Sequence, residues 1–579
     1  MKELKKLKKY LKKYKFKLIA GFIFIILSNF FTTLIPTIIK DSVDLLNNIN
    51  QPNIINLLIK QTILIILFSA LGGIFRYYIR QTIIVSSRLI ENDLRNDLFE
   101  HIIKLPYRFF YKNSTGNLMA LATNDINAVR NFLGPSIMYS VDNIIKLIFI
   151  LIMLLRLDVK LTILSLLPLP FISIIVIITG RKVNQYYSQV LKKFAFLTSI
   201  AQENISLVRV VKAYNLQNNF VEKFDNENNE YYHLNMKMFK IMSLVQPLLV
   251  FLVGTSLTIN LLLGGYDVIT GRLSVGSLTA FTIYLGLLIW PMFAFGWVTN
   301  MVQQAIASMK RLNEIFSLSE EPITTNITLN EVIKEIKFHN VSLTLDNINI
   351  INNISFTIKK GQKVAFIGKT GAGKSTIFNL ITKIYEPTSG NIYINNIDIK
   401  NISHQELRSN ITYITQEPFL FSDSIKNNIL YCCKNADTKI LQQAINIAGL
   451  IKDIENFPEG VETIIGERGI TLSGGQKQRT AIARAIASNS DIYLFDDSFS
   501  AIDTNTEEII LKNLFNFLEN KTAIFISHRI STIKNCDYIY IIDNGKIIEQ
   551  GTHNHLLEKG GYYTKLYNHQ LLEKELDEL

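Results

Sequence analysis

Long apolar runs alternate with polar segments over the first half of the chain. The first apolar run, LIAGFIFIILSNFFTTLIPTII, follows a lysine-rich opening, MKELKKLKKYLKKYKFK. Five further runs lie at about 63–78, 132–155, 161–179, 241–264 and 275–298. Each is apolar over enough residues to cross a bilayer as a helix. We therefore predict six membrane spans, and we interpret the opening segment as an amphipathic helix lying on the inner membrane face.

The segments that join these runs differ in length and charge. Segments 81–130 and 181–240 are long, helical in pattern and rich in lysine and arginine, whereas 41–53, 156–160 and 265–272 are short and hold few basic residues. Basic segments stay on the cytoplasmic side of a membrane. We therefore predict a multi-pass protein of the inner, cytoplasmic membrane, with both chain ends and both long segments in the cytoplasm.

The pattern changes after the sixth run. From about residue 336 short β-rich runs give way to alternating strands and helices, which is typical of an α/β domain. A chain of 579 residues is also too long for one core. We predict a membrane domain over 1–320, a linker over 321–335 and a cytoplasmic α/β domain over 336–579.

Composition agrees with this division. Hydrophobic residues make up 48% of the chain, and the formal net charge is +12. A positive cytoplasmic side explains that charge without a nucleic-acid partner, and we expect none. The three cysteines, Cys432, Cys433 and Cys536, lack metal-ligand spacing, which argues against a metal site built on thiolates.

A phosphate-binding loop opens the second domain. The stretch KVAFIGKTGAGKST contains G-x-x-x-x-G-K-[ST] in full, between an apolar strand and a helix. Glycines let backbone N–H groups approach phosphate oxygens, and the helix N-terminus adds positive potential. Lys374 would reach the β- and γ-phosphates of ATP, and the Ser375 hydroxyl would ligate Mg²⁺. The predicted ATP-binding residues here are Gly368, Lys369, Thr370, Gly371, Ala372, Gly373, Lys374, Ser375 and Thr376.

A second buried strand, DIYLFDD, ends in two acids. Downstream of a phosphate loop, the first of them, Asp496, is the expected partner of Mg²⁺. ATP and Mg²⁺ are therefore the cofactors that we predict.

The stretch LSGGQKQR lies between these two elements, and with it the domain resembles the nucleotide-binding domain of ATP-binding cassette (ABC) transporters. Further family landmarks follow in order: a Q-loop with Gln416, an exporter-type X-loop over 463–469, a D-loop SAID that ends at Asp503, and a switch histidine, His528. The resemblance implies that Gln416 joins Ser375 and Asp496 around Mg²⁺. It also implies that Asp497, His528 and Gln416 act in ATP hydrolysis.

The first half resembles the membrane domain of the same family. Segments 109–130 and 203–215 are similar to the cytoplasmic loops that carry its coupling helices. The implied fold is a six-helix membrane domain of the type I/IV exporter class, fused to a cytoplasmic α/β P-loop domain. Such a chain is a half-transporter, so two must associate. In the family each ATP lies between the phosphate loop of one chain and the signature of the other. The residues implied to act on the partner's ATP are Leu472, Ser473, Gly474, Gly475 and Gln476.

Asp497 departs from the family pattern, in which a glutamate polarises the attacking water. Aspartate is about 1.5 Å shorter, roughly one C–C bond, and misplacement on that scale costs about 10²-fold in rate. We therefore predict that this site hydrolyses ATP slowly. Two arrangements remain open: a homodimer with two slow sites, or a heterodimer whose partner brings the glutamate. The intact signature favours the heterodimer, as in the asymmetric bacterial multidrug exporters that the chain resembles.

Leu345 is a second departure. Exporters usually stack an aromatic residue on adenine at this position, in a stretch similar to VSLTL. Leucine packs on the ring without aromatic stacking, and Phe338 is the alternative aromatic residue nearby.

The function that these features imply is ATP-driven export by alternating access. The cargo that we predict is hydrophobic or amphipathic, since the spans hold few charges and several aromatic residues that would line an apolar pocket. These are Phe22, Phe24, Tyr77, Tyr78, Trp290, Phe293 and Phe295. A lipid flippase and a homodimeric exporter with slow ATPase are the alternatives, and a channel or receptor built on the same scaffold would not pump.

Overall fold

The computed structural model describes the chain except residues 1–2, 47–52, 322–331, 434–436, 467–471 and 578–579, together with a few side chains within helices. It divides into two compact units, Met1–Glu320 and Glu321–Leu579, which we describe separately. Most of the predicted linker over 321–335 lies outside the described residues.

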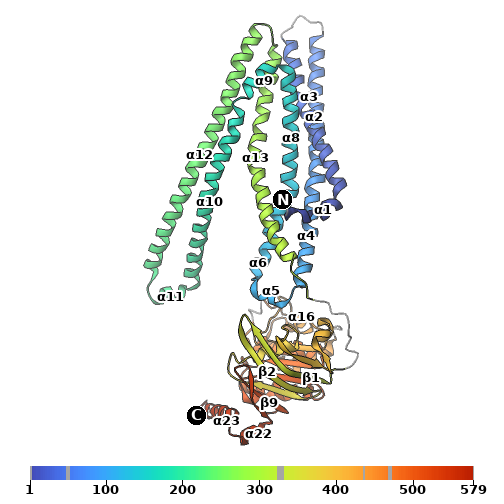
Figure 1. The fold of residues 1–579 in the computed structure, drawn as a ribbon, viewed down its shortest axis with the longest axis vertical. Coiled ribbons are helices and arrows are strands. Elements are labelled where there is room, and N and C mark those ends of the chain that lie inside the picture. The colour runs from blue at the N-terminus through green and yellow to red at the C-terminus, as the bar shows by residue number, and fades with distance from the viewer. Residues whose placement is uncertain (1–2, 47–52, 322–331, 434–436, 467–471, 578–579) are drawn as a thin grey trace. The chain divides into compact units, whose positions relative to one another are not determined.

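The described part of the first unit consists of helices joined by short turns and contains no strand (Figure 1). Its helices begin with η1 (Glu3–Leu7), α1 (Lys8–Lys13), α2 (Lys15–Leu46), α3 (Ile54–Ile79), η2 (Arg80–Ile84), α4 (Val85–Ile103), α5 (Tyr107–Lys112) and α6 (Thr115–Ala120). They continue with η3 (Leu121–Asp125), α7 (Ile126–Asn131), η4 (Phe132–Ser136), α8 (Ile137–Leu157), α9 (Val159–Leu166), α10 (Leu169–Ser206), α11 (Val208–Ala213), α12 (Gln217–Ile269) and α13 (Val275–Phe316). Three of them, η2, η3 and η4, are π-helical turns within longer helices.

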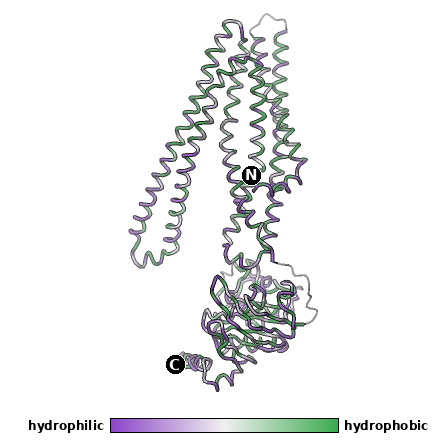
Figure 2. Tube along the Cα trace, viewed as in Figure 1, coloured by the Kyte–Doolittle hydropathy of each residue, from purple (hydrophilic) through white to green (hydrophobic). Residues whose placement is uncertain are grey.

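Five helical segments of the described chain are long and apolar enough to cross a membrane. They are Lys15–Leu46, Ile54–Ile103, Thr115–Leu157, Gln217–Ile269 and Val275–Phe316. The other predicted span, 161–179, coincides with α9 and the start of α10, where several side chains lie outside the described part. Figure 2 shows that the apolar stretches give way to hydrophilic residues toward the α11 end of α10 and α12. The helices therefore extend beyond the length that a bilayer requires.

The opening segment packs on other helices of this unit, and its position on the inner membrane face stays a prediction. Leu7 and Tyr10 are buried in a cluster with Ile90, Leu94 and other residues. The Tyr10 hydroxyl donates to Asp97 at 2.7 Å. The lysines of this segment extend the contact, since Lys13 pairs with Asp93 and Lys9 with Asp97. The apolar side of the segment therefore covers α4.

The second unit contains two sheets. An antiparallel sheet has the order β2-β1-β4-β5, and a six-stranded sheet has the order β10-β9-β3-β8-β7-β6. Their strands are β1 (Glu335–Leu345), β2 (Ile348–Lys359), β3 (Lys363–Ile367), β4 (Ser389–Ile394), β5 (Ile397–Asp398), β6 (Ile411–Ile414), β7 (Ile492–Asp496), β8 (Thr522–Ile526), β9 (Tyr538–Asp543) and β10 (Lys546–Gly551). Neighbours from β9 to β6 are parallel, so their carboxyl ends meet at one edge.

Helices and turns of the second unit connect these strands. They are α14 (Lys374–Ile381), η5 (Ile399–Asn401), α15 (His404–Ser409), α16 (Ile425–Leu430), α17 (Thr438–Ile447), α18 (Ile451–Asn456), η6 (Gly460–Glu462), α19 (Gly474–Ser488), α20 (Thr504–Phe517), α21 (Ile530–Ile533), α22 (His553–Glu558) and α23 (Tyr562–Asp577). Strands β7 and β8 are buried along their whole length and read as continuous apolar runs, as expected for parallel strands covered on both faces. Their rigid ends position the polar residues that follow.

Candidate ATP site

The predicted phosphate loop joins β3 to α14. Gly373 has a φ of 97°, and a Cβ there would lie 2.8 Å from the Ile350 carbonyl oxygen, so only glycine fits. Lys374 follows as the first residue of α14, and its ammonium donates to the carbonyls of Gly368 at 2.8 Å and Lys369 at 2.9 Å. The loop thus holds the lysine against its own backbone, above a helix N-terminus that favours anions.

Ser375 and Asp496 meet beside this loop. The Ser375 hydroxyl donates to one Asp496 oxygen at 2.9 Å, and the Tyr413 hydroxyl donates to the other at 3.0 Å. Asp496 ends β7 and Tyr413 lies on β6, next to it in the sheet. A hydroxyl and a carboxylate are the hard oxygen ligands that Mg²⁺ prefers. These residues therefore fit the metal that the sequence predicts.

Burial shifts the pKa values of two charged groups at this site, Asp496 and Lys374. It raises the pKa of Asp496 above its usual range, and the hydrogen bonds from Ser375 and Tyr413 offset this only in part. It lowers the pKa of Lys374, against the opposing effect of Asp497 and Asp496. Both groups are thus poorly hydrated, and a ligand that carries a metal and a polyphosphate would supply the charges that each lacks.

Asp497 lies next to Asp496 in a left-handed backbone conformation, with a φ of 45°. Its N–H donates to the Ile526 carbonyl at 2.8 Å, which ties the turn to the end of β8. Gln416 approaches its carboxylate, with 3.5 Å between the amide nitrogen and the Asp497 oxygen. The carboxylate also raises the pKa of His528, although burial and Lys374 lower that pKa overall. The structure thus brings together Asp497, Gln416 and His528.

The signature residues begin α19. Ser473 is its N-cap and forms a capping box with Gln476, in which the Ser473 N–H donates to the Gln476 side chain at 2.9 Å. The Gln476 amide also donates to Asp453 at 2.9 Å, so this side chain is held within its own unit. Leu472 is buried in the core, and residues of the X-loop from 467 onward lie outside the described part.

The D-loop packs closely on the signature helix. A Cβ on Gly475 would lie 2.9 Å from the Ala501 carbonyl oxygen, so glycine permits the approach. Gln478 then bridges the two segments, because its amide donates to Ser500 at 3.0 Å and accepts from the Ala501 N–H at 2.8 Å. Asp503 caps α20 by accepting from the Thr506 N–H at 2.9 Å. Close packing at Gly475 and the hydrogen bonds of Gln478 therefore hold the signature and the D-loop together.

Four supporting residues were not singled out from the sequence. Tyr413 and Gln478 act as described above. Arg529 donates to the carbonyls of Ser500 at 3.1 Å and Ile502 at 3.0 Å, which fixes the D-loop from its other side. Gln570 of α23 donates to the His528 carbonyl at 2.6 Å and accepts from the Ile530 N–H at 2.9 Å. Gln478 lies within the stretch LSGGQKQR and Arg529 directly follows His528, but no local pattern marks Tyr413 or Gln570.

At the position where exporters usually stack an aromatic ring on adenine, this chain has a leucine, and the nearby phenylalanine does not replace it. Leu345 ends β1 and is half-buried against the core of this unit. The alternative, Phe338, is wrong as a stacking residue, because its side chain is 1% exposed and stacks on Phe356 with ring centroids 4.3 Å apart. Of the two residues considered, only Leu345 is accessible to a base.

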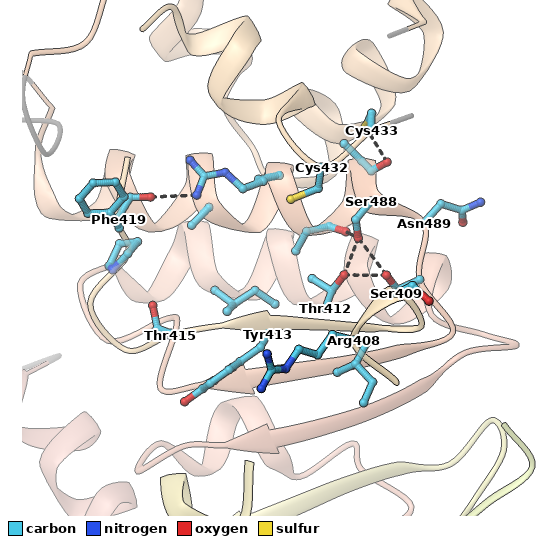
Figure 3. A pocket seen from close by; sticks show the side chains of 18 of the residues that line it. Arg408, Ser409, Thr412, Tyr413, Thr415, Phe419, Cys432, Cys433, Ser488 and Asn489 are labelled. Carbon is cyan, nitrogen blue, oxygen red and sulfur yellow. Dashed lines mark hydrogen bonds between the residues drawn. The ribbon is translucent and has the colours of Figure 1, made fainter. Parts of the chain in front are cut away.

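A separate hollow of about 610 Å³ lies between β6 and α19 (Figure 3). Arg408, Thr412 and Cys432 line it, with Arg484 of α19, whose guanidinium donates to the Phe419 carbonyl at 2.8 Å. None of the phosphate-loop residues takes part. The hollow therefore lies beside both the strand that leads to Gln416 and the helix that carries the signature, which contact each other through Thr412 and Ser488.

Comparisons with known proteins cover both units. Residues 18–292 match the ABC transporter transmembrane region, and residues 351–500 match the ABC transporter family. A probable multidrug resistance ABC transporter ATP-binding/permease protein, YheI, of Bacillus subtilis is 38% identical over 86% of each chain. An ATP-dependent lipid A-core flippase of Syntrophus aciditrophicus is 33% identical, over 89% of this chain and 86% of its own. The solved structure of a bacterial Atm1-family ABC exporter with ATP bound has a TM-score of 0.79 and 25% identity, over 97% of this chain and 98% of that one.

Proposed function

The chain belongs to the ABC transporter family and is an ATP-hydrolysing exporter of that fold, and from this premise we propose that it is the weakly hydrolysing half of a heterodimer. Its cargo in this proposal is hydrophobic or amphipathic, of the multidrug type. We place it in the cytoplasmic membrane with both ends in the cytoplasm, and we retain the domain boundaries 1–320 and 336–579.

The observation that carries the proposal is Asp497. Its turn is fixed by the Asp497 N–H to Ile526 bond at 2.8 Å, so the backbone has little freedom to advance a short side chain. A general base must come within hydrogen-bond reach of the water that it activates. Aspartate and glutamate have similar pKa values, so reach and not basicity is the deficit.

The other residues retain their roles in this proposal. Backbone N–H groups of 368–376 would hold the phosphates, Lys374 would turn from its loop carbonyls to the β- and γ-phosphates, and Ser375, Asp496 and Gln416 would hold Mg²⁺. Bound Mg²⁺ neutralises charge on the phosphates. Gln416 and His528 orient the water and the γ-phosphate, while Asp497 withdraws its proton slowly. ATP therefore stays bound here for longer than at the partner's site.

Replacing Asp497 with glutamate tests the deficit in reach. We expect D497E to raise the rate of ATP hydrolysis at this chain's own site, in the transporter assembled with its partner, by up to about 10²-fold. Asp491→Glu is the matched control, since Asp491 precedes the same strand at its other end. Phosphate release by both variants is measured in lipid nanodiscs. Unchanged turnover in D497E would contradict the proposal.

The subunit composition is tested on the native assembly. A tagged chain purified from its own membranes should bring with it a second, unlike ABC half-transporter that carries glutamate after its Mg²⁺-binding aspartate. Mass spectrometry identifies the second subunit. An assembly of two identical chains with rapid ATP turnover is the opposite result, and it would remove the asymmetry.

A further inference from the structure

Both oxygens of the Asp496 carboxylate accept a hydrogen bond from a side chain. The Ser375 hydroxyl donates to Oδ1 at 2.9 Å, and the Tyr413 hydroxyl donates to Oδ2 at 3.0 Å. Asp496 is buried, with 4% of its surface exposed, so water contributes little to holding this carboxylate. The two hydroxyl groups therefore fix the direction in which its oxygens point.

The sheet positions Tyr413 for this contact. Tyr413 lies opposite Leu494 on the neighbouring parallel strand, so the two side chains project from the same face of the sheet. Asp496 follows Leu494 by two residues and shares that face. The Tyr413 ring packs edge to face against Phe378 of α14, with ring centroids 5.6 Å apart. This packing restrains the ring, and the hydroxyl reaches the carboxylate from a fixed direction.

The helix that carries Ser375 is held by the same tyrosine. Ser375 lies in the first turn of α14, and Phe378 follows it by three residues, so the two side chains are neighbours on one face of this helix. Tyr413 therefore contacts α14 through its ring and the end of β7 through its hydroxyl. A carboxylate bound on both oxygens in this way cannot rotate without breaking a hydrogen bond.

Mg²⁺ and Ca²⁺ differ in what they require of such a carboxylate. Mg²⁺ demands near-octahedral geometry from its ligands, whereas Ca²⁺ accepts flexible sites and often binds both oxygens of one carboxylate. Residues that hydrogen-bond to a metal ligand orient that ligand, and losing one of them typically costs about 10–100-fold in metal affinity. A fixed carboxylate with one oxygen held by Tyr413 therefore suits Mg²⁺ better than Ca²⁺.

From these contacts we propose that Tyr413 is a positioning residue that gives this ATP site its preference for Mg²⁺ over Ca²⁺. It acts through Asp496, by restraining the carboxylate and by occupying the oxygen that a metal bound to both oxygens would need. This inference rests on the proposed ATP site and its metal. It goes beyond them by assigning the choice of metal to a side chain that does not itself hold the metal.

Nucleotide binding with each metal measures this preference without hydrolysis. The full chain in lipid nanodiscs is titrated with a fluorescent, non-hydrolysable ATP analogue at saturating Mg²⁺, at saturating Ca²⁺, and with both metals removed by EDTA. We expect the unaltered chain to bind the Mg²⁺ complex of the analogue more tightly than the Ca²⁺ complex. Tyr413→Phe keeps the ring and removes only the hydroxyl. It should lower the ratio of the Ca²⁺ to the Mg²⁺ dissociation constant by about tenfold.

A matched variant separates the loss of this hydroxyl from a general defect in folding. Tyr493→Phe removes a hydroxyl from the adjoining strand β7, where the ring belongs to the other hydrophobic cluster of this unit, and should leave the ratio unchanged. A folding defect weakens binding of both complexes alike, whereas loss of positioning weakens the Mg²⁺ complex more. The same ratio in Tyr413→Phe and Tyr493→Phe would overturn the proposal.

The same titrations distinguish this inference from the proposals on which it rests. If the analogue does not bind under any condition, the ATP site itself is overturned, and the role of Tyr413 with it. If EDTA leaves binding unchanged, the metal site and the role of Tyr413 are overturned while the ATP site stands. Metal-dependent binding with the same ratio in both variants overturns only the role of Tyr413. The heterodimer is judged separately, on the subunits that purify together.

Discussion

At the proposed ATP site, Leu345 is the residue expected to contact the adenine ring. It is half-buried at the end of β1, and Phe338 lies too deep in the core to replace it. Stacking of a base on an aromatic side chain is worth about 1–3 kcal/mol. We expect Leu345→Tyr to tighten ATP binding by roughly tenfold, measured by titration of the full chain with a fluorescent ATP analogue. Leu345→Met keeps the size without the ring and should change little, so equal gains in both variants would contradict stacking.

His528 makes the stability of the nucleotide-free protein depend on pH. Its pKa lies below the ordinary value of 6.5, chiefly because it is buried. The unfolded chain therefore takes up a proton at a higher pH than the folded one, and stability is lost as pH falls below about 6.5. We expect His528→Gln to weaken that loss, measured by thermal unfolding of the full chain in nanodiscs at several pH values. His233→Gln, a histidine of α12, is the control and should leave the slope unchanged.

Helix α23 connects the end of the chain to the loop of His528. Gln570 holds both the His528 carbonyl and the Ile530 N–H, and each such bond contributes about 1 kcal/mol. We expect Gln570→Leu, made in the D497E background, to lower ATP turnover several-fold while ATP binding is retained. Asn568→Leu changes an exposed residue of the same helix and should not alter turnover. A loss of binding that equals the loss of turnover would indicate unfolding instead.

Sequence reasoning identified the elements whose functional residues follow one another along the chain. The phosphate loop, the paired acids after β7 and the signature each occupy one short segment. The supports around them come from distant segments: Tyr413 reaches Asp496 because β6 and β7 are neighbours, and Gln570 reaches His528 across the chain. No local pattern encodes such contacts. The contact of the opening segment with α4 could not be predicted for the same reason, since it joins distant residues such as Tyr10 and Asp97.

At the scale of the whole molecule, the membrane domain and the nucleotide domain were both predictable because their hydrophobic periods differ. Apolar runs long enough to span a bilayer indicate the first, and strand–helix alternation indicates the second. The charges inside the spans were the exception. Asp142 and Lys146 stand four positions apart in the run at 132–155, on one face of α8, and that spacing was the available signal. Only the packing of α3 and α13 beside them forms a cavity.

In the proposed heterodimer, the phosphate loop and the signature of this nucleotide domain act on different ATP molecules. In that assembly Lys374 serves the slow site of this chain, whereas Ser473 completes the competent site of the partner. We therefore expect Ser473→Ala to lower the ATP turnover of the assembled transporter by at least tenfold, and Lys374→Ala to lower it much less, because losing one transition-state donor costs about 10²–10³. Ser403→Ala controls for the lost helix cap, since Ser403 caps α15 in the same way. In a homodimer each ATP site contains both Lys374 of one chain and Ser473 of the other, so both changes would alter the same sites. Equal losses of turnover from Ser473→Ala and Lys374→Ala would therefore contradict the asymmetric arrangement.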